Sequence, residues 1–182
     1  MADDPTDAID LLLEQHAQIE DLFRDVLTFT GEDKQEAFED LVRLLSVHET
    51  AEEQIIHPLA RTSGETDMVD ARLEEEREAK ELLKTLYDDG TKAPGFDTRL
   101  LELRLAVLAH AKHEERYEFP QLRRLHSGAR LKAAAVAIRA AEAVAPTRPH
   151  PGVESATKNV LLGGPTALVD RIRDTLQNRG SD

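Results

Sequence analysis

The sequence predicts an all-α protein whose main part is an antiparallel up-down four-helix bundle. Apolar residues recur every three or four positions along four long segments, which is the spacing of one helix face. Aromatic residues are only 4% of the 182 residues, and strong helix formers such as Ala, Leu, Glu and Arg dominate. The connections between the four segments are short, so we expect neighbouring helices to run in opposite directions.

The first helix can be capped by Thr6 or Asp7 and is broken at residues 30–33. Its inner face is predicted to hold Ile9, Leu12, His16, Ile19, Phe23 and Val26. The second helix runs from about residue 34 to 62 and ends at Ser63-Gly64. Its inner face is predicted to hold Leu41, Leu45, His48, Glu52, Ile55 and Leu59.

The third helix is expected over about residues 66–87, and residues 88–95 form a turn. Its aligned residues are Val69, Leu73, Glu76, Leu83 and Tyr87. The fourth helix begins near Asp97. Its inner face is predicted to hold Leu100, Leu103, Val107, His110, Glu114, Tyr117 and Gln121.

Three regions are expected along the chain: the bundle at 1–126, an Ala-rich helical extension at 127–145, and a tail at 146–182. The tail opens with a Pro-rich linker at 146–152, where three prolines exclude a helix. An amphipathic helix is expected at about 165–178, but it is too short to stand alone. It could dock on the bundle, cover its open end, mediate a homodimer or bind a protein partner.

Composition narrows the function classes. The chain has 36 acidic and 23 basic residues and a formal charge of −13, which disfavours nucleic acid and anionic membranes as partners. It has no cysteine, so disulfides, thiolate metal sites and iron–sulfur clusters are excluded. No apolar run approaches the ~18 residues of a transmembrane helix. The acidic N-terminus lacks the features of a signal peptide, so a cytoplasmic location is expected.

Each apolar stripe contains polar residues that do not suit a core. They are His16, His48, Glu52, Glu76, His110 and Glu114. Buried carboxylates are costly unless they are paired or bind a metal ion. Mid-helix positions of an antiparallel bundle lie at similar depth, so these side chains are expected to form one polar layer. A layer of imidazoles and carboxylates inside an apolar bundle is the form that a metal site takes.

An internal repeat reinforces this interpretation. Residues 48–58 and 110–120 both read HxxxEExxxxP. The His and the first Glu are four apart, so both side chains leave the same helix face and can share or bridge metal ions. The proline comes six residues after that Glu, where a helix should bend or end.

With these motifs, residues 6–126 resemble the hemerythrin-like, HHE-type metal-binding domains. The resemblance implies a four-helix bundle that holds two non-haem irons. It implies ligands at His16 on the first helix, at His48 and Glu52 on the second, and at His110 and Glu114 on the fourth. The two carboxylates would bridge the irons. The stretch around 146–151 and the helix after it also resemble the C-terminal segments of some bacterial members of the family.

The third helix departs from the family pattern. The family usually has Glu-His-Arg-Glu there, whereas this chain has Glu75-Glu76-Arg77-Glu78. Glu76 is the best replacement ligand, and Glu75 and Glu78 are neighbours that could substitute. Additional carboxylate favours harder ions and ferric iron. The departure therefore favours oxidation, peroxide chemistry (catalase-like or oxidase activity) or iron or redox sensing over reversible oxygen carriage.

Several assignments stay open at this point. The small ligand is O2, peroxide or NO, and manganese or zinc could replace iron. A sensor that signals through the 146–182 tail is one alternative, and a helical interaction module that has lost its metal is another. Tyr117 is expected on the inner face, mostly as a core residue. His57 is interpreted as structural or surface, His113 as exposed or hydrogen-bonded to a ligand, and Glu53 and Glu115 as orienting groups or solvent-facing residues.

Overall fold

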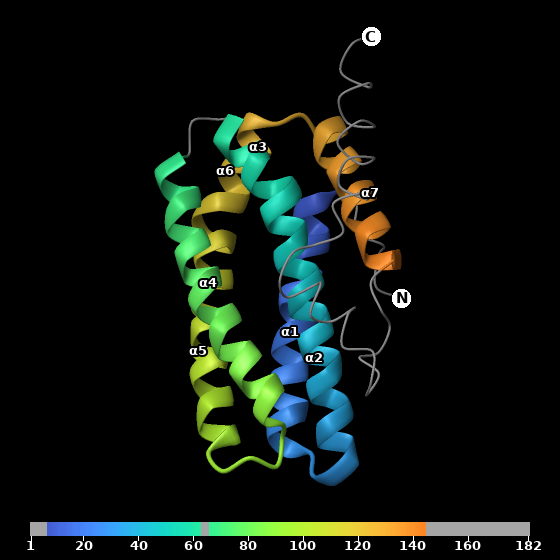
Figure 1. The fold of residues 1–182 in the computed structure, drawn as a ribbon. Helices are drawn as coiled ribbons and strands as arrows, with labels where there is room; N and C mark the ends of the chain where they lie inside the picture. The colour runs from blue at the N-terminus through green and yellow to red at the C-terminus, as the bar shows by residue number, and fades with distance from the viewer. Residues whose placement is uncertain (1–6, 63–65, 145–182) are drawn as a thin grey trace.

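The computed structural model describes residues 7–62 and 66–144 (Figure 1). The side chains of Gln54 and of residues 62–76 and 141–144 are outside this description. The predicted linker and amphipathic helix of the tail also lie outside the described residues. The described part is helical throughout apart from short turns, and it contains no strand.

Four long helices form the predicted up-down bundle: α1 (Ala8–Thr28), α2 (Gly31–Ala51), α4 (Thr66–Asp89) and α5 (Phe96–His113). Figure 1 shows α1 and α2 side by side, with α4 and α5 forming the other half. The second predicted helix is continuous, because α2 passes through a π-helical turn, η1 (Glu52–Ile56), into α3 (His57–Thr62). In the same way α5 passes through η2 (Glu114–Glu118) into α6 (Phe119–Leu125).

Local sequence explains the helix boundaries. The Asp7 carboxylate accepts hydrogen bonds from the backbone N–H groups of Ile9 and Asp10 at 2.9 and 3.0 Å, so it is the N-cap of α1. Gly31 has a φ of +63°, which lets the chain reverse between α1 and α2 within two residues. Gly95, with a φ of +78°, occupies the corresponding position before α5.

Among the described residues, buried apolar side chains form two clusters, one at each end of the bundle. The lower cluster includes Phe23, Phe38, Leu41, Leu83 and Leu100. The upper cluster joins the first half of α1 to α3, α6 and the additional helix α7 (Gly128–Val144). The upper cluster includes Ile9, Leu12, Ile56, Phe119, Leu131 and Ile138. The predicted polar layer therefore lies between two water-excluding regions.

None of the helices in the described ranges is both long enough and apolar enough to cross a membrane.

Candidate metal centre

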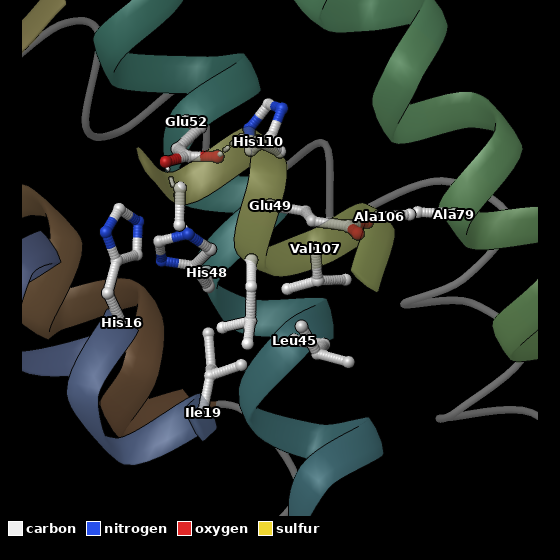
Figure 2. Close-up of a pocket in the computed structure, with 12 residues that line it drawn as sticks. His16, Ile19, Leu45, His48, Glu49, Glu52, Ala79, Ala106, Val107 and His110 are labelled. Atoms are coloured by element: carbon white, nitrogen blue, oxygen red, sulfur yellow. Dashed lines mark ion pairs between the residues drawn. The ribbon is translucent and has the colours of Figure 1, made fainter. Parts of the chain in front are cut away.

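Four of the predicted ligands meet in the middle of the bundle. His16, His48, Glu52 and Glu114 are all buried, and one ligand atom from each lies within 4.8 Å of the others. His16 comes from the middle of α1, and His48 comes from the last turn of α2. Glu52 and Glu114 are the first residues of the two π turns. Figure 2 shows His16 and His48 beside each other, with Glu52 and His110 next to them.

The histidines approach the carboxylates through their Nε2 atoms. His48 Nε2 lies 3.2 Å from Glu52 Oε1, and His16 Nε2 lies 3.5 Å from Glu114 Oε2. His110 Nε2 lies 3.4 Å from Glu114 Oε1 and 3.7 Å from Glu52 Oε2. His110 therefore contacts both carboxylates, Glu52 and Glu114.

The carboxylate oxygens have an unusual environment. All four oxygens of Glu52 and Glu114 are buried and form no hydrogen bond within the described structure, and the same holds for His16 Nε2. Both glutamates have an exposed fraction of 0%. Leaving such groups unsatisfied costs about 1–3 kcal/mol each, and more for charged groups. Imidazole nitrogens and carboxylate oxygens together suit iron, manganese or zinc, so these residues fit a bound metal ion.

Two hydrogen bonds behind the histidines set their orientation. His16 Nδ1 lies 2.8 Å from Glu115 Oε1, and His48 Nδ1 lies 2.8 Å from Gln15 Oε1. When each Nδ1–H donates to its oxygen, the lone pair of Nε2 faces the centre, which is the tautomer that a metal ligand needs. Glu115 therefore takes the orienting role expected of it. Glu53 is exposed and pairs with Lys80.

The orienting role of Gln15 was missed from the sequence. Gln15 is buried beside His16, on the side of α1 that faces α2. A single glutamine inside a helix belongs to no recognisable motif. The available signal was its place on a second buried row, four residues after Leu11 and four before Ile19.

The π turns explain how the second and fourth helices can continue past a proline instead of ending there. The backbone N–H of His57 donates to the carbonyl of Glu52, and that of Phe119 donates to the carbonyl of Glu114. These five-residue steps come immediately before Pro58 and Pro120. Proline has no N–H, and its ring clashes with the carbonyl four residues earlier in a regular α-helix. The wider turn accommodates the proline and places a glutamate at its start.

The expectation for Tyr117 is wrong. Its side chain is 51% exposed instead of lying on the inner face. Within a π turn each residue advances by a smaller angle than in an α-helix, so a residue three positions after Glu114 no longer shares its face. Glu118 is buried in its place, with Oε1 3.6 Å from Nδ1 of the partly exposed His113. His57 is also buried, in agreement with the structural alternative.

The third-helix position is only partly described. Glu76 lies on α4, but its side chain is outside the described residues, as is that of Glu75. A ligand role for Glu76 therefore stays a prediction. Ala79, nearly one turn further along α4, lines the cavity beside the centre, and Glu78 is exposed.

A small cavity of about 30 Å³ adjoins the cluster. His16, His48, Glu52 and His110 line it, together with apolar residues such as Val107 and Ala79. Glu49, which was not among the predicted ligands, also lines it; its Oε2 lies 3.5 Å from Lys80 Nζ. In Figure 2 the Glu49 side chain points toward Ala106 and Ala79, away from the two histidines. The cavity has room for a water-sized or diatomic ligand.

Burial and close contact give the metal-free cluster an uneven distribution of protons. Burial lowers the pKa of His48 to about 3, so its imidazole is neutral. Burial opposes protonation of His110, but the carboxylates of Glu114 and Glu52 outweigh it and raise its pKa to about 12. Burial and the neighbouring Glu114 raise the pKa of Glu52 to about 8.

Glu114 behaves in the opposite way to Glu52. Burial would raise its pKa, but contacts with His110 and His16 outweigh burial and hold the pKa well below its usual range. Burial likewise opposes protonation of His16, whose pKa is nevertheless raised by Glu114 and Glu52. Without a metal ion, the Glu52 carboxyl group and the His110 imidazole are therefore protonated near neutral pH.

Comparison with known proteins identifies the family and the fold. Residues 7–146 match the hemerythrin HHE cation binding domain. The crystal structure of a hemerythrin HHE cation binding domain-containing protein from Mycobacterium kansasii superposes with a TM-score of 0.68. The match covers 90% of this chain and 98% of that one at 22% sequence identity, so it shows a common fold.

A curated relative from Nostoc sp. (strain PCC 7120), described as a DNA nickase, is 29% identical over 116 residues. The match covers 63% of this chain and 33% of the relative, so this chain spans about a third of the length of that protein. The domain match extends over most of the chain and includes its buried cluster of histidines and glutamates. The chain belongs to the hemerythrin HHE cation-binding domain family.

Proposed function

We propose that this protein is a non-haem di-iron protein that binds or reacts with a small oxidant: O2, peroxide or NO. The observation that carries the proposal is the set of four buried, unsatisfied oxygens on Glu52 and Glu114, faced by histidine nitrogens at 3.2–3.7 Å. Two carboxylates in contact with three imidazoles offer more donor atoms than one metal ion needs.

The proposed ligands are His16, His48, Glu52, His110 and Glu114, with Glu76 completing the set from α4. Glu52 and Glu114 would bridge the two ions, because His110 contacts both of them and each also faces a histidine of its own. When bound, the irons would supply redox chemistry toward the small ligand. The protein holds the imidazoles in the correct tautomer and keeps bulk water away through the two apolar clusters.

We place reactivity ahead of reversible oxygen carriage. The family histidine on the third helix is replaced by Glu76, and extra carboxylate stabilises ferric iron. The adjoining cavity of about 30 Å³ admits only a small molecule. Peroxide consumption and oxidation are therefore the reactions to assay first.

The first test is the metal content per chain, by mass spectrometry on protein purified without an affinity metal or a chelator. We expect about two irons per chain, as in other carboxylate-rich bundle sites. Glu52→Ala should lose the metal, whereas the matched variant Glu53→Ala, at an exposed neighbouring position, should retain it. Circular dichroism would verify that both variants remain helical.

A full metal complement in Glu52→Ala would disprove the ligand assignment. If the unmodified protein still takes up no metal after anaerobic reconstitution with ferrous iron, the alternative of a helical interaction module replaces this proposal.

A second candidate function is an iron or redox sensor that signals through the 146–182 tail. Gln15, which hydrogen-bonds His48, also lines a surface groove, here called the α1–α2 groove. This groove has a volume of about 530 Å³ and is lined by α1 residues between Leu11 and Asp25 and by α2 residues between Asp40 and Val47. A change at His48 can therefore reach the surface through one hydrogen bond. Deleting 146–182 should leave a sensor with its metal but without its partner, whereas a simple enzyme would keep its activity.

The nicking activity in the description of the Nostoc relative is not part of the proposal. The match covers only a third of that protein, and a formal charge of −13 disfavours contact with a phosphate backbone.

A further inference from the structure

The α1–α2 groove combines apolar and acidic side chains. Leu22, Leu44 and Val47 line it and are each half-buried. The acidic residues that line it are Glu14, Asp21, Asp25 and Asp40, and Arg43 is the one base among the described lining residues. A complementary occupant would present a short apolar stripe flanked by positive charge.

Helix α7 lies next to the start of this groove. It packs against α1 and α2 and completes the upper apolar cluster through Leu131 and Ile138. Leu11 belongs both to that cluster and to the groove lining, so the groove starts where the cover provided by α7 stops. Figure 1 shows α7 beside the α1–α2 pair at the end of the bundle that holds α3, ending partway along its length.

The sequence after α7 has the matching chemistry. As a helix, residues 165–178 would place Leu168, Ile172 and Leu176 on one stripe with Arg171 and Arg173 on either side of it. Asp170 and Asp174 would fall on the opposite face. Residues 145–182 contain five basic and four acidic side chains, although the whole chain has 23 and 36. Within 165–178 the two arginines are matched by two aspartates, so the positive charge that could face the groove is confined to the flanks of the apolar stripe.

The length of the 165–178 segment matches the length of the α1–α2 groove. A 14-residue helix over 165–178 would be about 21 Å long, and the distance from Leu11 to Asp25 along α1 is about 21 Å as well. The 20 residues from 145 to 164 can span up to roughly 65 Å when extended, more than the length of α1. The segment can therefore reach the groove of its own chain.

We propose that residues 165–178 dock as an amphipathic helix in the α1–α2 groove of the same chain. Leu168, Ile172 and Leu176 pack on the apolar lining. Arg171 and Arg173 face the acidic residues of the groove. The docking does not depend on a bound metal, so its failure would leave the proposed di-iron site untouched.

A disulfide test can be made specific because the chain has no cysteine. Ile172→Cys, at the centre of the segment, is combined with Leu44→Cys or Val47→Cys at the groove. Mild oxidation should give a monomeric, internally cross-linked product, identified by mass spectrometry of its linked peptides. The matched control combines Ile172→Cys with Leu105→Cys, at a 67% exposed position on α5, and should cross-link at least several-fold less.

Reversing the charge of the two arginines gives a second test of the docking. In the Ile172→Cys, Leu44→Cys background, Arg171→Glu with Arg173→Glu should lower the cross-link yield several-fold. Arg148→Glu, in the Pro-rich linker, should not. Disulfide-linked dimers as the main product would mean that a second copy occupies the groove, and would overturn the proposal. Equal yields at Leu44 and Leu105 would overturn it as well.

Discussion

At the scale of single residues, we expect the groups that hydrogen-bond the proposed ligands to matter almost as much as those ligands themselves. Gln15 Oε1 accepts a hydrogen bond from His48 Nδ1 at 2.8 Å and Gln15 is itself buried, so this bond helps to fix the orientation of the imidazole. Gln15→Ala should lower metal affinity about 10–100-fold, because the ring loses both its orientation and its preferred tautomer. Competition with a coloured chelator would measure the change.

Gln15→Glu is the matched variant, because it keeps an acceptor oxygen in the same place. It should retain most of the affinity that Gln15→Ala loses. If both variants bind metal as well as the unmodified chain, His48 is either not a ligand or is oriented by something else.

Metal affinity should also depend on pH. The pKa of Glu52 is raised from 4.5 to about 8 and that of His110 to about 12, so both groups hold protons at pH 7 in the metal-free protein. Metal binding requires both groups without their protons, and proton release is therefore part of the binding reaction. Raising the pH from about 6 to 8 should strengthen binding, because the Glu52 proton becomes easier to remove.

Calorimetry in buffers with different ionisation enthalpies would count the released protons directly. We expect about one or two per chain at pH 7. Binding that is independent of pH, with no proton released, would show that the carboxylates already bind metal in their ionised form or do not take part.

At the scale of helices, the regular elements were predictable and the irregular ones were not. The four long helices follow from a period of 3.6 residues, and that period persists through α1, α2 and α5. The same reasoning placed six side chains in one layer, and the structure brings five of them together: His16, His48, Glu52, His110 and Glu114. The sixth, Glu76, stays a prediction. Repetition of HxxxEExxxxP was the signal that separated this layer from chance pairs of His and Glu.

The period fails inside the π turns. Extrapolation of the α-helical stripe placed Tyr117 on the inner face, but the wider turn exposes Tyr117 and buries Glu118. The prolines at 58 and 120 did indicate an irregularity, and a bend or an end was the natural expectation. The helices continue, and Ile56 and Phe119, where the π turns end, are buried in the upper cluster, a tertiary contact that no local pattern records.

At the scale of the whole molecule, the candidate site ties together helices that are distant in sequence. His16 and Glu114 are almost one hundred residues apart, and the centre joins α1 to both π turns. An unfolded chain cannot offer this arrangement, so a metal ion that binds only the folded protein must stabilise it. A free metal concentration one hundred times Kd would contribute about 2.7 kcal/mol to the free energy of unfolding.

For a chain of this length, that contribution should raise Tm by roughly 5–10 °C on anaerobic addition of ferrous iron. A chelator should reverse the shift. Glu52→Ala should show no shift, although its metal-free form should remain folded, because the substitution removes a buried carboxyl group without hydrogen bonds rather than an apolar contact of either cluster. An equal shift in Glu52→Ala would show that the stabilising metal does not use Glu52 as a ligand, although Glu52 lies within 4.8 Å of the other three members of the cluster.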